Sequence, residues 1–232
     1  MSTPLSYALE DGVATIAMDD GKVNAMSVAM LEALHAAFEK AESEQAIVLL
    51  HGRPGCFSAG FDLKTLAAGG DHAKRMLRLG AELAERVLGF PRPVVAACSG
   101  HAYPMGAFLL LASDRRIGAR GDFRIGLNEV RIGLTLPHFA VEIARQRLLP
   151  AYFQRVVAGD LYAPDEAVVA GFLDELVEPG MLIGRALEVA RDLRAVHAEA
   201  HVGTKRRVRA RALAALREAI ERDTQELDLA VA

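Results

Sequence analysis

Short apolar runs alternate with longer stretches of helical periodicity along this chain, which is the pattern of an α/β protein. Residues 46–51 and Val94–Cys98 are almost wholly apolar, so each predicts a strand that is buried on both faces of a sheet. Apolar side chains recur at helical spacing from Met30 to Phe38, and Ser27 is suitably placed to cap that helix. The chain is therefore expected to form a sheet whose strands are linked by helices.

A hairpin is predicted at the start of the chain, because Asp11-Gly12 is a strong two-residue turn signal between residues 6–10 and Val13–Met18. The same periodicity and breaker signals predict the later elements. These are a helix capped by Asp71 and ending at Gly89, strands at 115–119 and 122–125, a helix at 138–148 and a strand at 172–177.

From Pro179 onward the pattern is helical, with a break expected near residues 200–203. No low-complexity linker separates this region from the preceding residues. We therefore expect a core at residues 1–178 that carries the site, and a C-terminal helical region at residues 179–232. The apolar face of that region requires a docking surface on the core or on a neighbouring subunit.

The composition limits the classes of function. Apolar residues make up 52% and charged residues 25% of the 232 positions, as in globular rather than disordered proteins. The net charge of −3 argues against nucleic-acid binding, which usually needs a large positive excess. Cys56 and Cys98 match neither a disulfide framework nor a metal-binding CxxC spacing. With no apolar run of about 18 residues and no signal-peptide pattern, a cytoplasmic protein acting on small molecules is expected.

Two glycine-containing loops are candidates for binding through the backbone. Residues 51–62 follow a predicted buried strand, so their N–H groups are expected at the carboxyl end of the sheet, where α/β proteins bind ligands. Residues 103–106 lead into a helix that has no Ser, Thr, Asp or Asn to cap it. Its first N–H groups require a partner, which is either an anion or oxyanion, or else water and nearby carbonyls.

Both loops carry a family resemblance. Residues 56–63, Cys-Phe-Ser-Ala-Gly-Phe-Asp-Leu, closely resemble the Phe-x-Ala-Gly-x-Asp-Leu signature of the crotonase superfamily of enoyl-CoA hydratases and isomerases. Residues 99–106, Ser-Gly-His-Ala-Tyr-Pro-Met-Gly, are similar to its second signature, Asn-Gly-x-Ala-x-Gly-Gly-Gly. The resemblance implies an α/β spiral of repeated β-β-α units, with a C-terminal α-helical region that assembles trimers or dimers of trimers.

The resemblance also implies an oxyanion hole. In this family two peptide N–H groups hold the thioester oxygen of an acyl-CoA, and by position they belong to Phe61 and Met105. Removing an α-proton places negative charge on that oxygen, and one such donor contributes about 10²–10³ in rate. Lys205 is expected to meet a phosphate of CoA. The other residues expected to contact the substrate are Ser58, Ala59, Gly60, Asp62, Leu63, Gly106 and Phe108.

The acid–base residue determines which reaction the resemblance predicts. Hydratases of the family carry two glutamates, and the corresponding positions here hold Phe108 and Glu129. A phenylalanine cannot activate water, whereas one carboxylate is enough to move a proton from C2 to C4 of a 3-enoyl-CoA. The apolar wall of Phe108 is expected to raise the pKa of the carboxyl group. Gly-Leu-Asn-Glu at 126–129 is similar to the mitochondrial-type 3,2-enoyl-CoA isomerases.

Isomerisation of 3-enoyl-CoA to 2-trans-enoyl-CoA in fatty acid β-oxidation is therefore predicted, with Glu129 as the acid–base and no metal or redox cofactor. CoA enters as part of the substrate, and neither nucleic acid nor membrane is an expected partner. One alternative is a hydratase, or another thioester enzyme of the family, in which a second group assists Glu129. A second is a non-catalytic acyl-CoA-binding protein, because Ser99, Pro104, Met105 and Phe108 depart from the common hydratase pattern.

Overall fold

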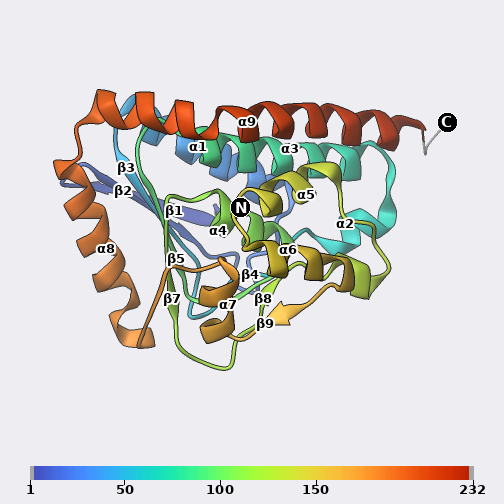
Figure 1. Cartoon of the computed structure of the whole chain (residues 1–232), viewed down its shortest axis with the longest axis horizontal. Helices are drawn as coiled ribbons and strands as arrows, with labels where there is room; N and C mark the ends of the chain where they lie inside the picture. The colour runs from blue at the N-terminus through green and yellow to red at the C-terminus, as the bar shows by residue number, and fades with distance from the viewer. Residues whose placement is uncertain (1–2, 230–232) are drawn as a thin grey trace.

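Two sheets carry the fold in the computed structural model, which describes residues 3–229 (Figure 1). Within this range the larger sheet has six strands in the order β1-β2-β3-β5-β7-β10, and the smaller has four in the order β4-β6-β8-β9. Neighbouring strands are parallel except for the antiparallel pairs β1–β2 and β8–β9. The strands are β1 (Leu5–Glu10), β2 (Val13–Met18), β3 (Ile47–His51), β4 (Gly55–Ser58), β5 (Val94–Cys98), β6 (Gly100–Ala102), β7 (Arg115–Ala119), β8 (Ile125–Gly126), β9 (Leu161–Tyr162) and β10 (Glu175–Val177).

Helices cover both faces of the larger sheet, so strand β3 is buried on both sides as predicted. Ile47 and Leu49 join the apolar cluster that packs under α8, while Val48 and Leu50 join the cluster formed with α1, α3 and α4. This division follows from the two-residue period of a strand. The helices are α1 (Val28–Ser43), α2 (Leu63–Ala68), α3 (Gly70–Gly89), α4 (Pro104–Ala112), α5 (His138–Arg145), α6 (Pro150–Arg155), α7 (Pro164–Ala170), α8 (Leu182–Asp192) and α9 (Ala198–Leu229).

The hairpin and the first helix form as the sequence predicts. Glu10 pairs with Val13 across the turn, and Asp11 and Gly12 both have positive φ, as a type I′ turn requires. The Ser27 hydroxyl accepts a hydrogen bond from the Met30 N–H at 3.3 Å and so caps α1. Local turn and cap chemistry is sufficient to fix both features.

The C-terminal helices pack on the remainder of the described chain. Helix α8 lies against β3, β5 and β7, whereas α9 runs along α3 and α5 at the top of Figure 1. The predicted break at 200–203 is wrong, because α9 continues through Gly203 and the break lies at residues 193–197. Packing against α3 and α5 offsets the roughly 1 kcal/mol that a glycine costs inside a helix. The assembly role of residues 179–232 stays a prediction.

Several predicted boundaries also need correction. Asp71 does not cap α3, because the N-cap is Gly69 at φ +64° and Asp71 lies within the first turn. The strand expected at 122–125 shortens to β8, since the Arg124 side chain bonds Asp122 and its backbone N–H bonds His101. The helix at 138–148 and the strand at 172–177 shorten to α5 and β10.

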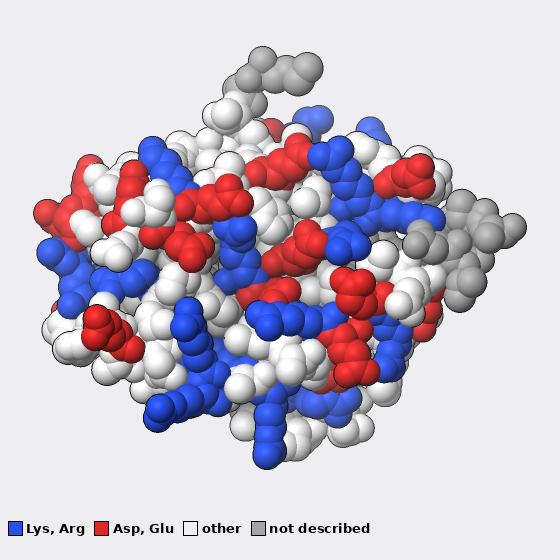
Figure 2. Space-filling model, turned by 90° about the horizontal axis from the view of Figure 1, so that it is seen from above, with Lys and Arg blue, Asp and Glu red and all other residues white. Residues whose placement is uncertain are grey.

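Charges of both signs are interspersed over most of the face that carries α9 (Figure 2). Exposed Arg217 pairs with Glu85, and Arg222 pairs with Glu218 at 3.0 Å on α9 itself. Such pairing neutralises part of the positive charge of α9, which weakens its attraction for a phosphate backbone. Among residues 3–229, every helix is too short or too polar to cross a membrane.

Candidate active site

Ser58 joins the two loops that the sequence marked as backbone donors. Its carbonyl oxygen accepts a hydrogen bond from the Tyr103 N–H at 2.9 Å, so the end of β4 lies beside the start of α4. Its hydroxyl donates to the Asn24 carbonyl at 2.7 Å and accepts from the Gly60 N–H at 3.1 Å. Ser58 is fully buried, and these bonds fix the backbone of the first loop.

The Phe61 amide lies outside the backbone pairing of its neighbours. The Met26 N–H donates to the Gly60 carbonyl at 2.8 Å, and the Asp62 N–H donates to the Met26 carbonyl at 3.4 Å. This short parallel bridge engages the residues on either side and leaves the Phe61 N–H unused by it. Asp62 then caps α2 by accepting from the Lys64 N–H at 2.9 Å.

The Met105 amide lies in the uncapped first turn of α4. Tyr103 occupies the N-cap without a side-chain hydrogen bond, and Pro104 follows it. The first α-helical bond runs from the Ala107 N–H to the Tyr103 carbonyl, so the Met105 N–H precedes the helical ladder. A Cβ placed on Gly60, where φ is +89°, would lie 3.7 Å from the Met105 nitrogen. The two predicted donor segments are therefore in contact.

A cavity of about 640 Å³ opens beside these segments. Its walls are predominantly apolar, which suits an acyl chain. Of the predicted site residues, the structure places Ala59, Gly60, Phe61, Leu63 and Glu129 on its walls. The remaining lining residues are Leu66, Leu77, Tyr103, Pro104, Asn128, Ile132, Leu134, Thr135, Leu136, Pro137, His138, Phe139, Asp223 and Glu226.

Glu129 is the buried carboxylate of this cavity wall. It follows β8 and opens a 3-10 turn, Glu129–Ile132, which ends at Gly133 in the left-handed conformation. The residue is 6% exposed, and its Oε2 has no hydrogen-bond partner among the described residues. Burial raises the pKa of Glu129 to about 7, because removing the carboxylate from water disfavours its charged form. A carboxyl group with this pKa can both accept and release a proton near neutrality.

Several predicted site residues are not among those that line the cavity. Ser58, Asp62, Met105, Gly106 and Phe108 are not among the lining side chains. A side chain on Gly106 would come within 2.9 Å of the Ser58 Cβ, so the glycine allows β4 and α4 to approach. Phe108 is fully buried and meets Phe139 edge-on, with ring centroids 5.2 Å apart. Both residues therefore support the wall from inside the core.

The predicted contact of Lys205 with a CoA phosphate does not agree with its position. Lys205 is 7% exposed, and its ammonium nitrogen lies 2.6 Å from a carboxylate oxygen of Asp114. Arg209 pairs with the other carboxylate oxygen at 2.9 Å. Burial lowers the pKa of Lys205 to about 8, while Asp114 favours the charged form. Lys205 therefore belongs to a buried ion pair with Asp114.

Some cavity residues gave no functional signal in the sequence. Tyr103 and Asn128 lie inside the recognised segments 99–106 and 126–129, but neither was assigned a role there. Asp223 and Glu226 come from α9 and reach the cavity by packing on α5. The sequence predicts that polar residues on a long amphipathic helix face solvent. Only the packing of α9 brings these two residues to the cavity.

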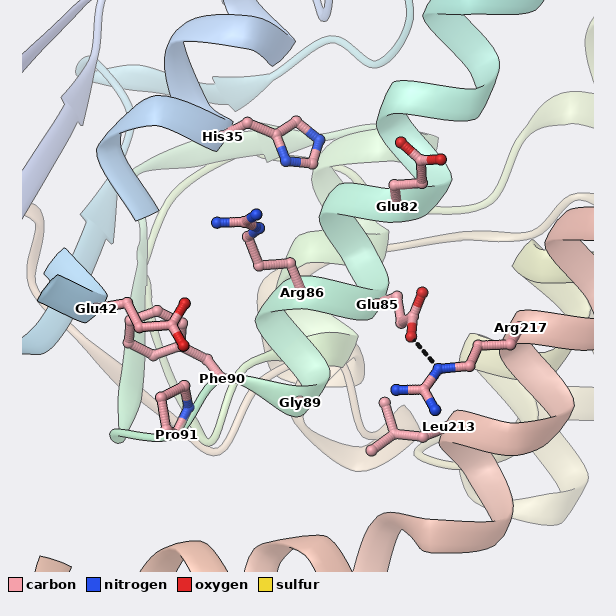
Figure 3. Close-up of a pocket in the computed structure, with 10 residues that line it drawn as sticks. All are labelled: His35, Glu42, Glu82, Glu85, Arg86, Gly89, Phe90, Pro91, Leu213 and Arg217. Carbon is pink, nitrogen blue, oxygen red and sulfur yellow. Dashed lines mark hydrogen bonds and ion pairs between the residues drawn. The ribbon is translucent and has the colours of Figure 1, made fainter. Parts of the chain in front are cut away.

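A second cavity of about 520 Å³ lies between α1, α3 and α9 (Figure 3). Arg86 points into it opposite His35 and Glu42, and Glu85 pairs with Arg217 at its edge. The predicted donors and Glu129 are all absent from its walls, which contain Glu42, Glu82 and Glu85. Without the predicted backbone donors and Glu129, this groove does not suit the predicted thioester chemistry.

One group of metal-ligand side chains borders the main cavity. Ligand atoms of His138, Asp223 and Glu226 lie within 4.8 Å of one another. Asp223 already accepts two backbone N–H groups, and His138 Nε2 lies 2.9 Å from a Glu226 carboxylate oxygen. These contacts join α5 to α9 and satisfy the group within the protein.

Comparison with known proteins gives the family. Residues 8–230 match the family described as Enoyl-CoA hydratase/isomerase. The chain belongs to this family. Over 168 residues it is 32% identical to a protein named probable enoyl-CoA hydratase from Bacillus subtilis (strain 168), covering 71% of this chain. That match spans only 63% of the Bacillus protein.

Solved structures share the fold over nearly the whole chain. An enoyl-CoA hydratase/isomerase family protein from Pseudomonas syringae is 45% identical, with a TM-score of 0.94 over 97% of this chain and 98% of that one. Human mitochondrial delta3-delta2-enoyl-CoA isomerase is 26% identical, with a TM-score of 0.90 over 97% of this chain and 90% of its own. The α/β crotonase fold with a C-terminal helical region is thereby confirmed.

Proposed function

We propose that this protein isomerises 3-enoyl-CoA to 2-trans-enoyl-CoA, with Glu129 as its acid–base. The observation that carries the proposal is the buried Glu129 carboxyl, which faces the cavity with an unpartnered oxygen and a pKa raised to about 7. The position at which hydratases carry another glutamate holds Phe108, whose ring is buried against Phe139. The human structure named above as an isomerase supports the same choice.

The reaction follows from these groups. The thioester oxygen accepts from the Phe61 and Met105 N–H groups while the Glu129 carboxylate takes a proton from C2. The C2–H electrons move toward the carbonyl, and a dienolate forms whose oxygen carries the charge. Glu129 then returns the proton to C4, so the double bond ends between C2 and C3. Two fixed backbone donors each contribute about 10²–10³ in rate by holding the oxyanion.

Hydration of a 2-enoyl-CoA is the second candidate. The Bacillus relative carries a hydratase name, and the Glu226 carboxylate lines the same cavity as Glu129. Hydration requires one group to activate water and another to deliver a proton to carbon. Glu226 is 62% exposed and pairs with His138, so it is a less suitable base than a buried carboxyl.

Further parts of the proposal follow from the chemistry. A base and two backbone donors suffice for the double-bond shift, so we include no metal or redox cofactor, and CoA enters with the substrate. We also include a cytoplasmic location, a role in β-oxidation and assembly into trimers or dimers of trimers. Mass measurement of the native protein in solution tests the assembly.

Two substrates test the reaction directly. Wild-type protein is expected to convert 3-hexenoyl-CoA to the conjugated product, which is followed by ultraviolet absorbance, and to leave crotonyl-CoA unhydrated. Glu129→Gln is expected to lower turnover by about 10²–10⁴, the usual contribution of a general acid–base group. Glu188→Gln, at an exposed ion pair on α8, is the control. Near-normal turnover in Glu129→Gln overturns the assignment, and hydration of crotonyl-CoA alone favours the second candidate.

A further inference from the structure

The first turn of α5 has no capping side chain of its own. Its N-cap residue is Pro137, which makes no side-chain hydrogen bond, although the first N–H groups of a helix need acceptors. Asp223 of α9 provides them. One carboxylate oxygen accepts from the His138 N–H at 2.7 Å, and the other accepts from the Phe139 N–H at 2.9 Å. A cap that is normally local therefore comes from the C-terminal helix.

The capped turn is part of the cavity wall. Pro137, His138 and Phe139 all line the cavity that contains Glu129, and so does Asp223. Both Asp223 carboxylate oxygens are engaged by backbone N–H groups. The role of Asp223 in the cavity is therefore to fix where the α5 turn lies.

A second contact holds the same turn at the rim. His138 Nε2 lies 2.9 Å from a carboxylate oxygen of Glu226, which is three residues beyond Asp223 and on the same face of α9. The Glu226 side chain is 62% exposed, whereas Asp223 is half-buried. Asp223 is consequently the inner of the two contacts and the one that water screens less.

We propose that Asp223 is a positioning residue that sets how well long acyl chains bind. The inference rests on the proposed function and concerns the acyl end of the same site. A short acyl group needs mainly the oxyanion donors and Glu129, whereas a longer chain must also lie along the apolar wall. That wall includes Leu66, Leu77, Leu136 and Phe139, and the last two adjoin the turn held by Asp223.

Kinetics on two chain lengths test the role. Asp223→Ala is expected to raise the KM for 3-dodecenoyl-CoA about tenfold. Loss of one helix cap costs free energy of about the size that corresponds to a tenfold change in a binding constant. The kcat and KM for 3-hexenoyl-CoA are expected to stay within about twofold. Asp223→Asn keeps one carbonyl acceptor and is expected to give an intermediate KM. Glu218→Ala, at an exposed pair on the same helix, is the matched control and should leave both substrates unchanged.

Other outcomes overturn the inference. An equal loss on both chain lengths in both Asp223 variants indicates a general structural role, and unchanged KM values for both substrates indicate no role in binding. Dissociation constants of hexanoyl-CoA and dodecanoyl-CoA are measured alongside by calorimetry. Weaker dodecanoyl-CoA binding in Asp223→Ala supports the inference even when wild-type protein turns over neither substrate and the proposed function fails. If the wild-type protein is active and Asp223→Ala leaves the ratio of the dodecanoyl-CoA and hexanoyl-CoA dissociation constants unchanged, the inference is rejected and the proposed function stands.

Discussion

The carbonyl oxygen of Ser58 accepts a hydrogen bond from the Tyr103 N–H at 2.9 Å. This bond joins the end of β4 to the residue that begins α4, and the Ser58 hydroxyl also accepts from the Gly60 N–H. One buried serine thus connects the segments that carry the Phe61 and Met105 amides. A fixed pair of donors stabilises an oxyanion without reorganising during the reaction.

Removing the Ser58 hydroxyl is expected to loosen this arrangement. Ser58→Ala leaves the Asn24 carbonyl and the Gly60 N–H without a partner, which costs about 1–3 kcal/mol in the free energy of unfolding. We expect kcat for 3-hexenoyl-CoA to fall by up to about 10², since displacement by about 1 Å costs that much, with a smaller change in KM. Steady-state kinetics and urea unfolding measure the two effects.

Ser113→Ala is the matched control for that variant. Ser113 is equally buried, and its hydroxyl donates to the Leu109 carbonyl at 2.7 Å at the other end of α4. It should lose stability while keeping kcat. A similar fall in kcat in both variants would assign the Ser58 effect to general destabilisation.

The pH dependence of isomerisation is expected to follow Glu129. Its carboxylate form is the base, and burial raises its pKa to about 7. The value of kcat/KM should therefore rise as pH increases through about 7 and level off above it, because the free enzyme must be deprotonated to react. A profile measured between pH 5 and pH 9 checks this. A rising limb centred near pH 4.5 would show that the carboxyl is solvated in the active protein.

Burial of Glu129 should also cost stability above neutral pH. The folded-state pKa is raised from 4.5 to about 7, so its stability contribution is complete below about pH 4.5 and is lost as pH rises through about 7. At about 1.4 kcal/mol per pH unit, the full effect is about 3 kcal/mol. The difference in unfolding free energy between Glu129→Gln and wild-type protein should consequently be more favourable to the variant at pH 8 than at pH 5. Urea unfolding at the two pH values measures it. A constant difference between the two pH values would contradict it.

Lys205 is expected to act in stability rather than in substrate binding. Lys205→Met removes a buried cation from Asp114, which keeps Arg209 and the Val94 N–H as partners. We expect a loss of about 1–3 kcal/mol in unfolding free energy, below the usual cost of breaking a buried pair because these partners remain. The KM for 3-hexenoyl-CoA should stay within about twofold.

Exposed Arg207 gives the comparison for Lys205. Arg207→Met should change neither the free energy of unfolding nor KM appreciably, because exposed charges contribute little. A large increase in KM confined to Lys205→Met would restore the predicted contact with a CoA phosphate.

Features with local causes were the ones that sequence could predict. The turn at Asp11-Gly12, the Ser27 cap and the apolar runs of β3 and β5 all form as expected, because neighbouring residues supply their interactions. The helix break expected at Gly203 is wrong because packing of α9 outweighs the propensity of a single glycine. Phe108 was expected to contact the substrate, whereas its side chain supports the cavity wall from the core, and only tertiary packing decides this.

The sequence by itself determined the buried strands β3 and β5, the hairpin, the two candidate donor loops and the candidate role of Glu129, because turn residues, apolar runs and family signatures are local properties. Only the tertiary structure decided that Asp223 caps α5 across 85 residues of chain and that Lys205 is buried against Asp114. Both contacts depend on where α9 packs. That packing is a balance of many weak apolar contacts between distant segments, so no short stretch of sequence specifies it.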